Sequence, residues 1–208
     1  MLHDLSFLAL TRLLGGPLME IDLTYDGLLP ASGNGKPSDE KLKNLWAMRR
    51  EFQAQLRHLY DENPVLRGEG GAEARAFSRI VRAPIEKEGR IYWALVSNRA
   101  KLKCSLEIGV LLNEDLPSVI RQSGDLDNRV KSIIDSLRLP GKYQEIQKYG
   151  PSAEEQPFIC LMEDDALVSG LNLTAGRLLK PNTPAQWAKV SVHVKVKIAE
   201  KTFENSAL

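Results

Sequence analysis

The chain has 208 residues, enough for one domain with a substantial buried core. Its composition, 43% hydrophobic and 26% charged, is that of an ordinary globular protein. The formal net charge of +1 excludes a protein that coats nucleic acid through its overall charge, so any attraction to a polyanion must come from a local patch.

The first eighteen residues are apolar but short. They lack the basic start and small-residue cleavage site of a signal peptide, and a membrane span would need about twenty apolar residues. We therefore expect an N-terminal extension over residues 1–18, a single domain over 19–208, a cytoplasmic location and no membrane contact. Cys104 and Cys160 lie in apolar runs without zinc-site spacing, which favours buried, reduced thiols.

The first third of the chain predicts a strand followed by a long helix. Apolar and polar side chains alternate over residues 20–25, and residues 26–37 are rich in loop-forming residues. Ser38 precedes an acidic first turn and is a credible N-cap for a helix that reaches about Tyr60. Residues 61–74 are polar and rich in glycine, which predicts a flexible excursion.

The middle of the chain is expected to be rich in β-structure. Residues 77–85 and 90–97 flank a four-residue turn and predict a hairpin, and the alternation over residues 104–112 predicts a further strand. After a linker over residues 113–123, an apolar stripe predicts a helix over about residues 126–137.

The last third is expected to contain a long connection and three strands. Residues 139–157 form the connection, residues 158–162 a short apolar strand, and residues 167–173 another strand. The strongest strand pattern covers residues 189–198. These elements predict an α+β fold, with a mixed or antiparallel sheet packed on one side by two main helices.

Two acidic segments stand out. On a helical wheel Asp127, Lys131 and Asp135 follow one another at i, i+4 and i+8 beside the apolar stripe, and a second acidic cluster, residues 163–165, follows an apolar strand. Carboxylates brought together raise one another's pKa unless a cation such as Mg²⁺ neutralises them. The acids alternatively serve as a helix cap, solvated surface and an i,i+4 pair with the lysine.

The string Asp125-Leu126-Asp127-Asn128 with Lys131 and Asp135, followed by Asp164-Asp165, resembles the RusA family of Holliday-junction endonucleases. The family motif is D-x-D-N-x-x-K-x-x-x-D followed by a D-D pair. The resemblance covers about residues 19–200, with extra sequence around residues 61–100 and 138–158. It implies a RusA-like fold with insertions and a homodimer that makes paired nicks across branched DNA in recombination or repair.

The resemblance also implies roles for individual residues. Mg²⁺, with Mn²⁺ as a substitute, would be held by Asp125, Asp127 and Asp165, with Asp164 as a weaker ligand. Lys131 would be the catalytic amine. Asn128 and Asp135 would support the helix start and the ligands from outside.

Basic residues near the motif and on the last strand are candidate DNA contacts: Arg121, Arg129, Lys142 and Lys195. The lysines of that strand equally suit a solvated face that discourages edge pairing. Two alternatives to a nuclease stay open. One is a catalytically inactive RusA-like protein that binds nucleic acid or another protein, and the other is an interaction module whose acids are only caps and surface.

Overall fold

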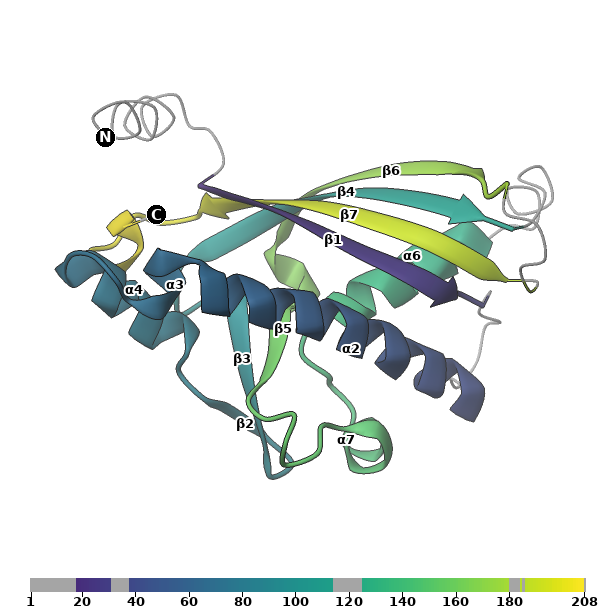
Figure 1. The fold of residues 1–208 in the computed structure, drawn as a ribbon, viewed down its shortest axis with the longest axis horizontal. Coiled ribbons are helices and arrows are strands. Elements are labelled where there is room, and N and C mark those ends of the chain that lie inside the picture. Colours follow the sequence, from purple (N-terminus) through teal and green to yellow (C-terminus); the bar gives the residue numbers. More distant parts are fainter. Residues whose placement is uncertain (1–17, 31–37, 114–124, 180–183, 185, 208) are drawn as a thin grey trace.

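The computed structural model describes residues 18–30, 38–113, 125–179, 184 and 186–207, and it confirms the α+β class (Figure 1). Helices in this part are α2 (Asp39–Glu62), α3 (Pro64–Arg67), α4 (Ala72–Val81), α6 (Asp125–Leu137) and α7 (Tyr143–Tyr149), with short 3₁₀ turns η1 (Asp165–Leu167) and η2 (Glu204–Ala207). The strands are β1 (Met19–Leu28), β2 (Ile85–Lys87), β3 (Arg90–Val96), β4 (Leu102–Leu112), β5 (Phe158–Met162), β6 (Val168–Arg177) and β7 (Trp187–Ile198). The predicted extension over residues 1–18 and the predicted linker lie almost entirely outside the described residues.

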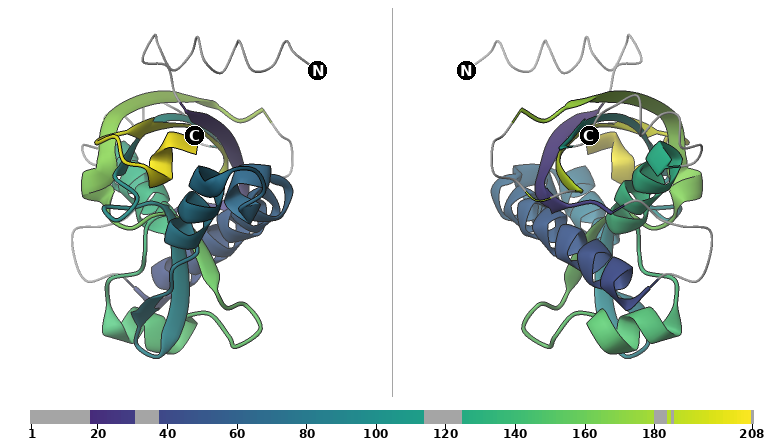
Figure 2. Two further views of the ribbon diagram at one scale, coloured as in Figure 1. Left: turned by 90° about the vertical axis from the view of Figure 1, so that its left-hand side faces the viewer. Right: turned by 90° about the vertical axis from the view of Figure 1, so that its right-hand side faces the viewer.

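The larger sheet has four strands in the order β1-β7-β4-β6. Strand β7 pairs antiparallel with β1 and β4, whereas β4 pairs parallel with β6. Side chains alternate between buried and solvent-facing along β1, β4 and β7, so one face belongs to the core. Figure 2 shows this sheet curving over α2 and α6, which cover the buried face.

A second, three-stranded sheet has the order β2-β3-β5 and was not expected. Strands β3 and β5 run parallel, and all five residues of β5 are buried. Burial on both faces is typical of a strand in parallel pairing. The single sheet predicted from the sequence is therefore wrong. The strand leading to the acidic cluster belongs to a separate layer beneath the larger sheet (Figure 1).

Helix α2 begins where the sequence predicts. The Ser38 hydroxyl accepts a hydrogen bond from the Lys41 amide at 3.2 Å, as an N-cap does. The helix has 24 residues and ends at Glu62, two residues beyond the predicted end. Its buried face includes Phe52 and Tyr60, which pack with the sheets in the main core.

The region predicted as a flexible excursion is instead helical. Asn63 caps α3 because its side-chain oxygen accepts hydrogen bonds from the next helix's first amides, Val65 and Leu66, at 3.0 and 3.1 Å. Gly68, with a φ of 78°, ends α3 in the left-handed conformation that glycine adopts readily. The excursion therefore has its own helix start and stop signals.

A hairpin forms near the predicted place, but two of the three residues of its first arm, Glu86 and Lys87, lie in the predicted turn. Strand β2 covers only Ile85–Lys87, and residues 77–81 belong to α4 instead of a strand. Phe77 and Val81 are both buried at helical spacing, with exposures of 0% and 1%. A short apolar run is compatible with both the helical and the strand period, and the tertiary contacts decide which of the two forms.

The connection over residues 139–157 also contains a helix, α7. Its Glu145 is buried and forms an ion pair with Arg49 of α2, with Nη1 and Oε1 2.7 Å apart. This long-range pair anchors α7, which explains why local sequence patterns did not reveal it.

Both cysteines are free and buried, as expected. Burial raises the pKa of the Cys104 thiol to about 11, so this thiol stays protonated at neutral pH. Within the described ranges, no helix combines the length and apolar character that crossing a membrane requires.

Candidate active site

A surface hollow of about 550 Å³ lies between α6 and the segment that joins β5 to β6. Its polar lining consists of Asp127, Lys131 and Asp135 from α6 and Asp165 from η1. Its apolar lining includes Val130 and Ile134 of the helix and Leu171 and Leu173 of β6. The two acidic segments, far apart in sequence, therefore meet at one hollow, which we call the acidic hollow.

The apolar stripe of α6 faces the core and so places three polar residues of the helix on the hollow: Asp127, Lys131 and Asp135. Ile133 and Leu137 are fully buried against the sheets, and this fixes the rotation of the helix. Asp127 and Lys131 then fall on the solvent-exposed flank, one turn apart, as the helical wheel predicts. The helix starts at Asp125, whose side chain lies outside the described part of the structure.

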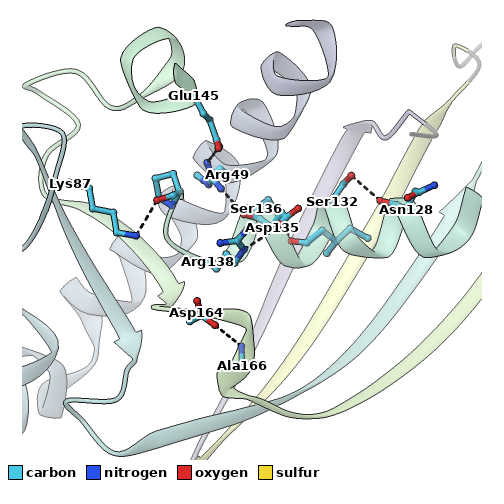
Figure 3. Close-up of polar contacts among 12 residues, drawn as sticks. Arg49, Lys87, Asn128, Ser132, Asp135, Ser136, Arg138, Glu145, Asp164 and Ala166 are labelled. Atoms are coloured by element: carbon cyan, nitrogen blue, oxygen red, sulfur yellow. Dashed lines mark hydrogen bonds and ion pairs between the residues drawn. The ribbon is translucent and has the colours of Figure 1, made fainter. Parts of the chain in front are cut away.

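Asn128 lies on the same helix but is not part of the hollow's lining. Its carbonyl accepts a hydrogen bond from the Ser132 hydroxyl at 2.9 Å (Figure 3). The next serine along, Ser136, bonds similarly to the Ile133 carbonyl at 2.6 Å. Such bonds remain within the helix.

Strand β5 holds the second acidic segment against the end of α6. Met162 forms an isolated parallel bridge with Arg138, and its carbonyl accepts a hydrogen bond from the Leu139 amide at 3.0 Å. The next residue, Glu163, donates its amide to Val96 at 2.9 Å, and its carboxylate accepts from the Asn98 amide at 3.1 Å. Glu163 therefore faces the β3–β4 turn, and within residues 163–165 only Asp164 and Asp165 are available to the hollow.

Asp164 acts as the N-cap of η1. Its carboxylate accepts a hydrogen bond from the Ala166 amide at 2.9 Å (Figure 3). That bond holds the pKa of the Asp164 carboxyl below its ordinary value, and Asp165, Arg138 and Lys87 act in the same direction. Asp165 lines the acidic hollow, and Asp164 does not.

Arg138 is a residue of the site that the sequence reasoning missed. Its Nε and Nη2 atoms both lie 2.8 Å from Oδ1 of Asp135. Burial alone would lower the pKa of Arg138, but the hydrogen bond to Asp135 raises it, with further contributions from Asp165 and Asp164. Figure 3 shows the guanidinium between Asp135 and Asp164. The arginine is thus a fixed cation between the two acidic segments.

Arg49 supports the site from behind. Its Nη2 donates to the Asp135 carbonyl at 2.6 Å, while Nη1 pairs with Glu145. The guanidinium also lies 4.5 Å from the centre of the Trp46 ring, a cation–π contact. One buried side chain of α2 therefore fixes α6 and α7 relative to each other (Figure 3).

The carboxylates of the hollow are oxygen donors, the ligand type that a hard divalent cation prefers. Among the described side chains, no three His, Cys, Asp or Glu residues are grouped closely enough to hold an ion by themselves. Mg²⁺, however, usually takes only one or two protein carboxylates together with water and substrate phosphate. Asp127 and Asp165 are both exposed and share the hollow, whereas Asp135 is already engaged by Arg138.

The predicted DNA contacts differ in their location and exposure. Arg129 is 1% exposed, so it is a core residue, and its assignment as a surface contact is wrong. Lys195 forms an ion pair with Glu107 on the outer face of the larger sheet. Lys142 is exposed just before α7, and Arg121 lies outside the described residues.

Three lysines lie near the acidic hollow. Burial lowers the pKa of Lys41, Asp135 opposes this effect, and Lys131 and Lys142 reinforce it. The charges of Lys131 and Lys142 therefore act on Lys41 at short range. Lys131 lines the acidic hollow, whereas Lys41 and Lys142 are not part of its lining among the described residues.

Comparison of the chain with protein-family models, curated proteins and solved structures found no match. The resemblance to the RusA family therefore rests on the motif residues of this chain.

Proposed function

We propose that the chain is a Mg²⁺-dependent DNA endonuclease of the RusA type. It resolves Holliday junctions or other branched DNA by paired nicks, as a cytoplasmic homodimer acting in recombination or repair. The observation that supports this most is the acidic hollow, where Asp127 and Lys131 of α6 meet Asp165 from a remote segment. Four of the motif residues that carry the resemblance line the hollow: Asp127, Lys131, Asp135 and Asp165.

The side chains have distinct roles in this proposal. Asp127 and Asp165 hold the metal ion together with Asp125, at the helix start two residues before Asp127. A bound Mg²⁺ supplies Lewis-acid activation of water and stabilisation of the leaving oxygen. Lys131 contributes a fixed positive charge for the scissile phosphate, because it lies one turn beyond Asp127 on the same wall.

Asp135 has a supporting role. Two nitrogens of Arg138 hold one oxygen of its carboxylate, and Arg49 holds its carbonyl. Arg138 also offsets the repulsion among the acids before a metal ion binds. The hollow can thus keep its shape in the absence of the ion.

The form of the hollow suits a polymer. Leu171 on its rim is 51% exposed, and the polar residues lie along the surface of α6. Small-molecule sites usually enclose most of their ligand. A phosphodiester backbone that passes across the surface needs no such enclosure.

The test is a cleavage assay with labelled four-way, three-way and linear duplexes, in Mg²⁺ or EDTA. We expect nicking of the branched substrates in Mg²⁺ alone. Asp127→Asn should abolish nicking while DNA binding in EDTA persists, and Asp61→Asn, an exposed aspartate of α2, should change neither. Nicking in EDTA, or full activity of Asp127→Asn, would overturn the proposal.

A second candidate is a catalytically inactive relative that binds nucleic acid or a protein. It is favoured by the Arg138–Asp135 contact, which gives the acidic segments a structural role without a metal ion. In that case the chain binds branched DNA equally well in Mg²⁺ and EDTA, and every substrate stays intact.

A further inference from the structure

A second hollow, of about 490 Å³, lies on α3 and α4. Its lining is basic: Arg67, Gly68, Ala72, Arg75, Ser78 and Arg79. We call it the arginine hollow. It occupies part of the extra sequence around residues 61–100, for which the RusA-type motif supplies no role. Figure 1 shows α3 and α4 at the end of the molecule where α2 finishes.

The charges of the arginine hollow are unbalanced. No carboxylate belongs to its lining among the described residues. Arg67 pairs with Glu69 at 2.7 Å, and Arg75 donates to the Gly70 carbonyl at 3.0 Å. Arg79 is exposed and makes no hydrogen bond or ion pair within the described ranges. At least two guanidinium charges therefore face the hollow without an acidic partner there.

The walls of the arginine hollow are held in place. The Ser78 hydroxyl donates to the Leu66 carbonyl at 2.7 Å, and Arg82 donates to the same carbonyl at 3.0 Å. A Cβ atom added at Gly68 would lie 3.2 Å from that of Ser78, so α3 and α4 pack closely. The arginines thus extend from a fixed pair of helices.

We propose that the arginine hollow binds a phosphate of the DNA backbone away from the cleavage site. Guanidinium groups match phosphate oxygens with paired hydrogen bonds and stay charged at all physiological pH values. This inference rests on the proposed function, because it takes the polyanion to be the DNA substrate. It adds a contact outside the acidic hollow.

The two hollows are too far apart for one phosphate group. Arg49, which contacts the Asp135 carbonyl, precedes the end of α2 at Glu62 by about 20 Å, at roughly 1.5 Å per residue. Phosphates on one strand are spaced by about 3.4 Å along the duplex axis. A DNA strand that follows α2 over this length therefore spans about six nucleotides.

The experiment measures how the affinity for labelled branched DNA falls with salt, by fluorescence anisotropy in EDTA. Each phosphate contact contributes about 0.9 to the slope of log K against log salt concentration. Arg79→Gln should therefore lower the slope, and Arg75→Gln/Arg79→Gln should lower it by about 0.9, the contribution of one phosphate contact. Arg177→Gln, which removes an exposed arginine at the end of β6, is the matched control and should leave the slope unchanged.

Two further measurements separate binding from folding. Arg75→Lys/Arg79→Lys should keep most of the slope, and thermal unfolding should show that all variants are folded. In Mg²⁺, Arg79→Gln should raise KM for the nicking of branched DNA and leave kcat unchanged.

The outcomes distinguish the inference from the proposed function. An unchanged slope in folded Arg79→Gln and in the double variant, with normal nicking, overturns the inference alone. An equal loss in Arg177→Gln also overturns it, since any surface arginine would then serve. A reduced slope without Mg²⁺-dependent nicking supports the phosphate site and overturns the nuclease. A wild-type chain that binds no DNA overturns both.

Discussion

The acidic hollow and the outer face of the larger sheet contain the same kinds of charged side chain in different arrangements. On the sheet face Lys195 pairs with Glu107, and His193 lies 2.8 Å from Asp22 and 3.6 Å from Glu20. In the acidic hollow Asp127 and Lys131 line an open space, although they are only one turn apart. On the sheet face, ion pairs between neighbouring strands neutralise the charged side chains. In the acidic hollow, the charged side chains on the concave wall remain available to a ligand.

The largest effect should come from the buried support of the hollow. Arg49→Met leaves Glu145 buried without its partner, which typically costs about 3–5 kcal/mol of unfolding free energy. Replacing both residues with apolar ones should cost less, because no uncompensated charge remains. Urea denaturation measures both. Equal losses in the single and double variants would contradict the role of the pair.

The next effect concerns the reaction. Lys131→Met should reduce kcat for nicking by about 10²–10³-fold, the usual loss when one charge that stabilises a transition state is removed. The matched variant on the sheet face, Lys189→Met, should nick normally. Equal losses of kcat in the two variants would show that a lysine in the acidic hollow contributes no more to nicking than a lysine on the sheet face.

Arg138→Gln should destabilise the chain by about 1.5–3 kcal/mol, the range for hydrogen bonds to charged groups. Asp135 then lies beside Asp164 and Asp165 without the cation between them. Added Mn²⁺ should restore part of the loss, because an ion that binds only the folded chain stabilises it. Thermal unfolding with and without Mn²⁺ is the measurement, and identical Mn²⁺ shifts in wild type and variant would contradict this role.

A substitution on the sheet face should lower the unfolding free energy far less. Glu107→Gln breaks an exposed pair, and such pairs contribute about 0–1 kcal/mol. A loss comparable to that of Arg138→Gln would remove the contrast between the two regions.

The smallest effect is a pH dependence. The Asp164 carboxyl has a pKa below its ordinary value, because it accepts the Ala166 amide. Its contribution to stability is therefore present above the ordinary carboxyl pKa and is lost as the pH falls through the lowered folded-state value. The stability difference between wild type and Asp164→Ala should shrink in acid. A difference that grows in acid would contradict this assignment.

The sequence alone predicts the elements whose signals are local. The cap at Ser38 predicts the start of α2, and the stripe through Ile133 predicts α6 and its polar flank. Arg129 was misjudged although the same stripe held the clue, because it lies four residues before Ile133. Its charge suggested the surface, while its spacing indicated the core.

Other features depend on contacts between distant segments. Arg138 and Asp135 are three residues apart, so their pairing is visible in the sequence. The approach of Arg138 to Asp164 depends on the bridge between Arg138 and Met162. The second sheet and α7 likewise depend on pairing between segments that are distant in sequence, which no local sequence pattern reveals.

The most direct measurement is a double-mutant cycle for Mn²⁺ binding, followed by electron paramagnetic resonance or calorimetry. If Asp127 and Asp165 hold one shared ion, Asp127→Asn and Asp165→Asn should each weaken binding strongly, and the double variant should be little worse than either. Strictly additive losses, or wild-type affinity in both single variants, would contradict a shared ion in the acidic hollow.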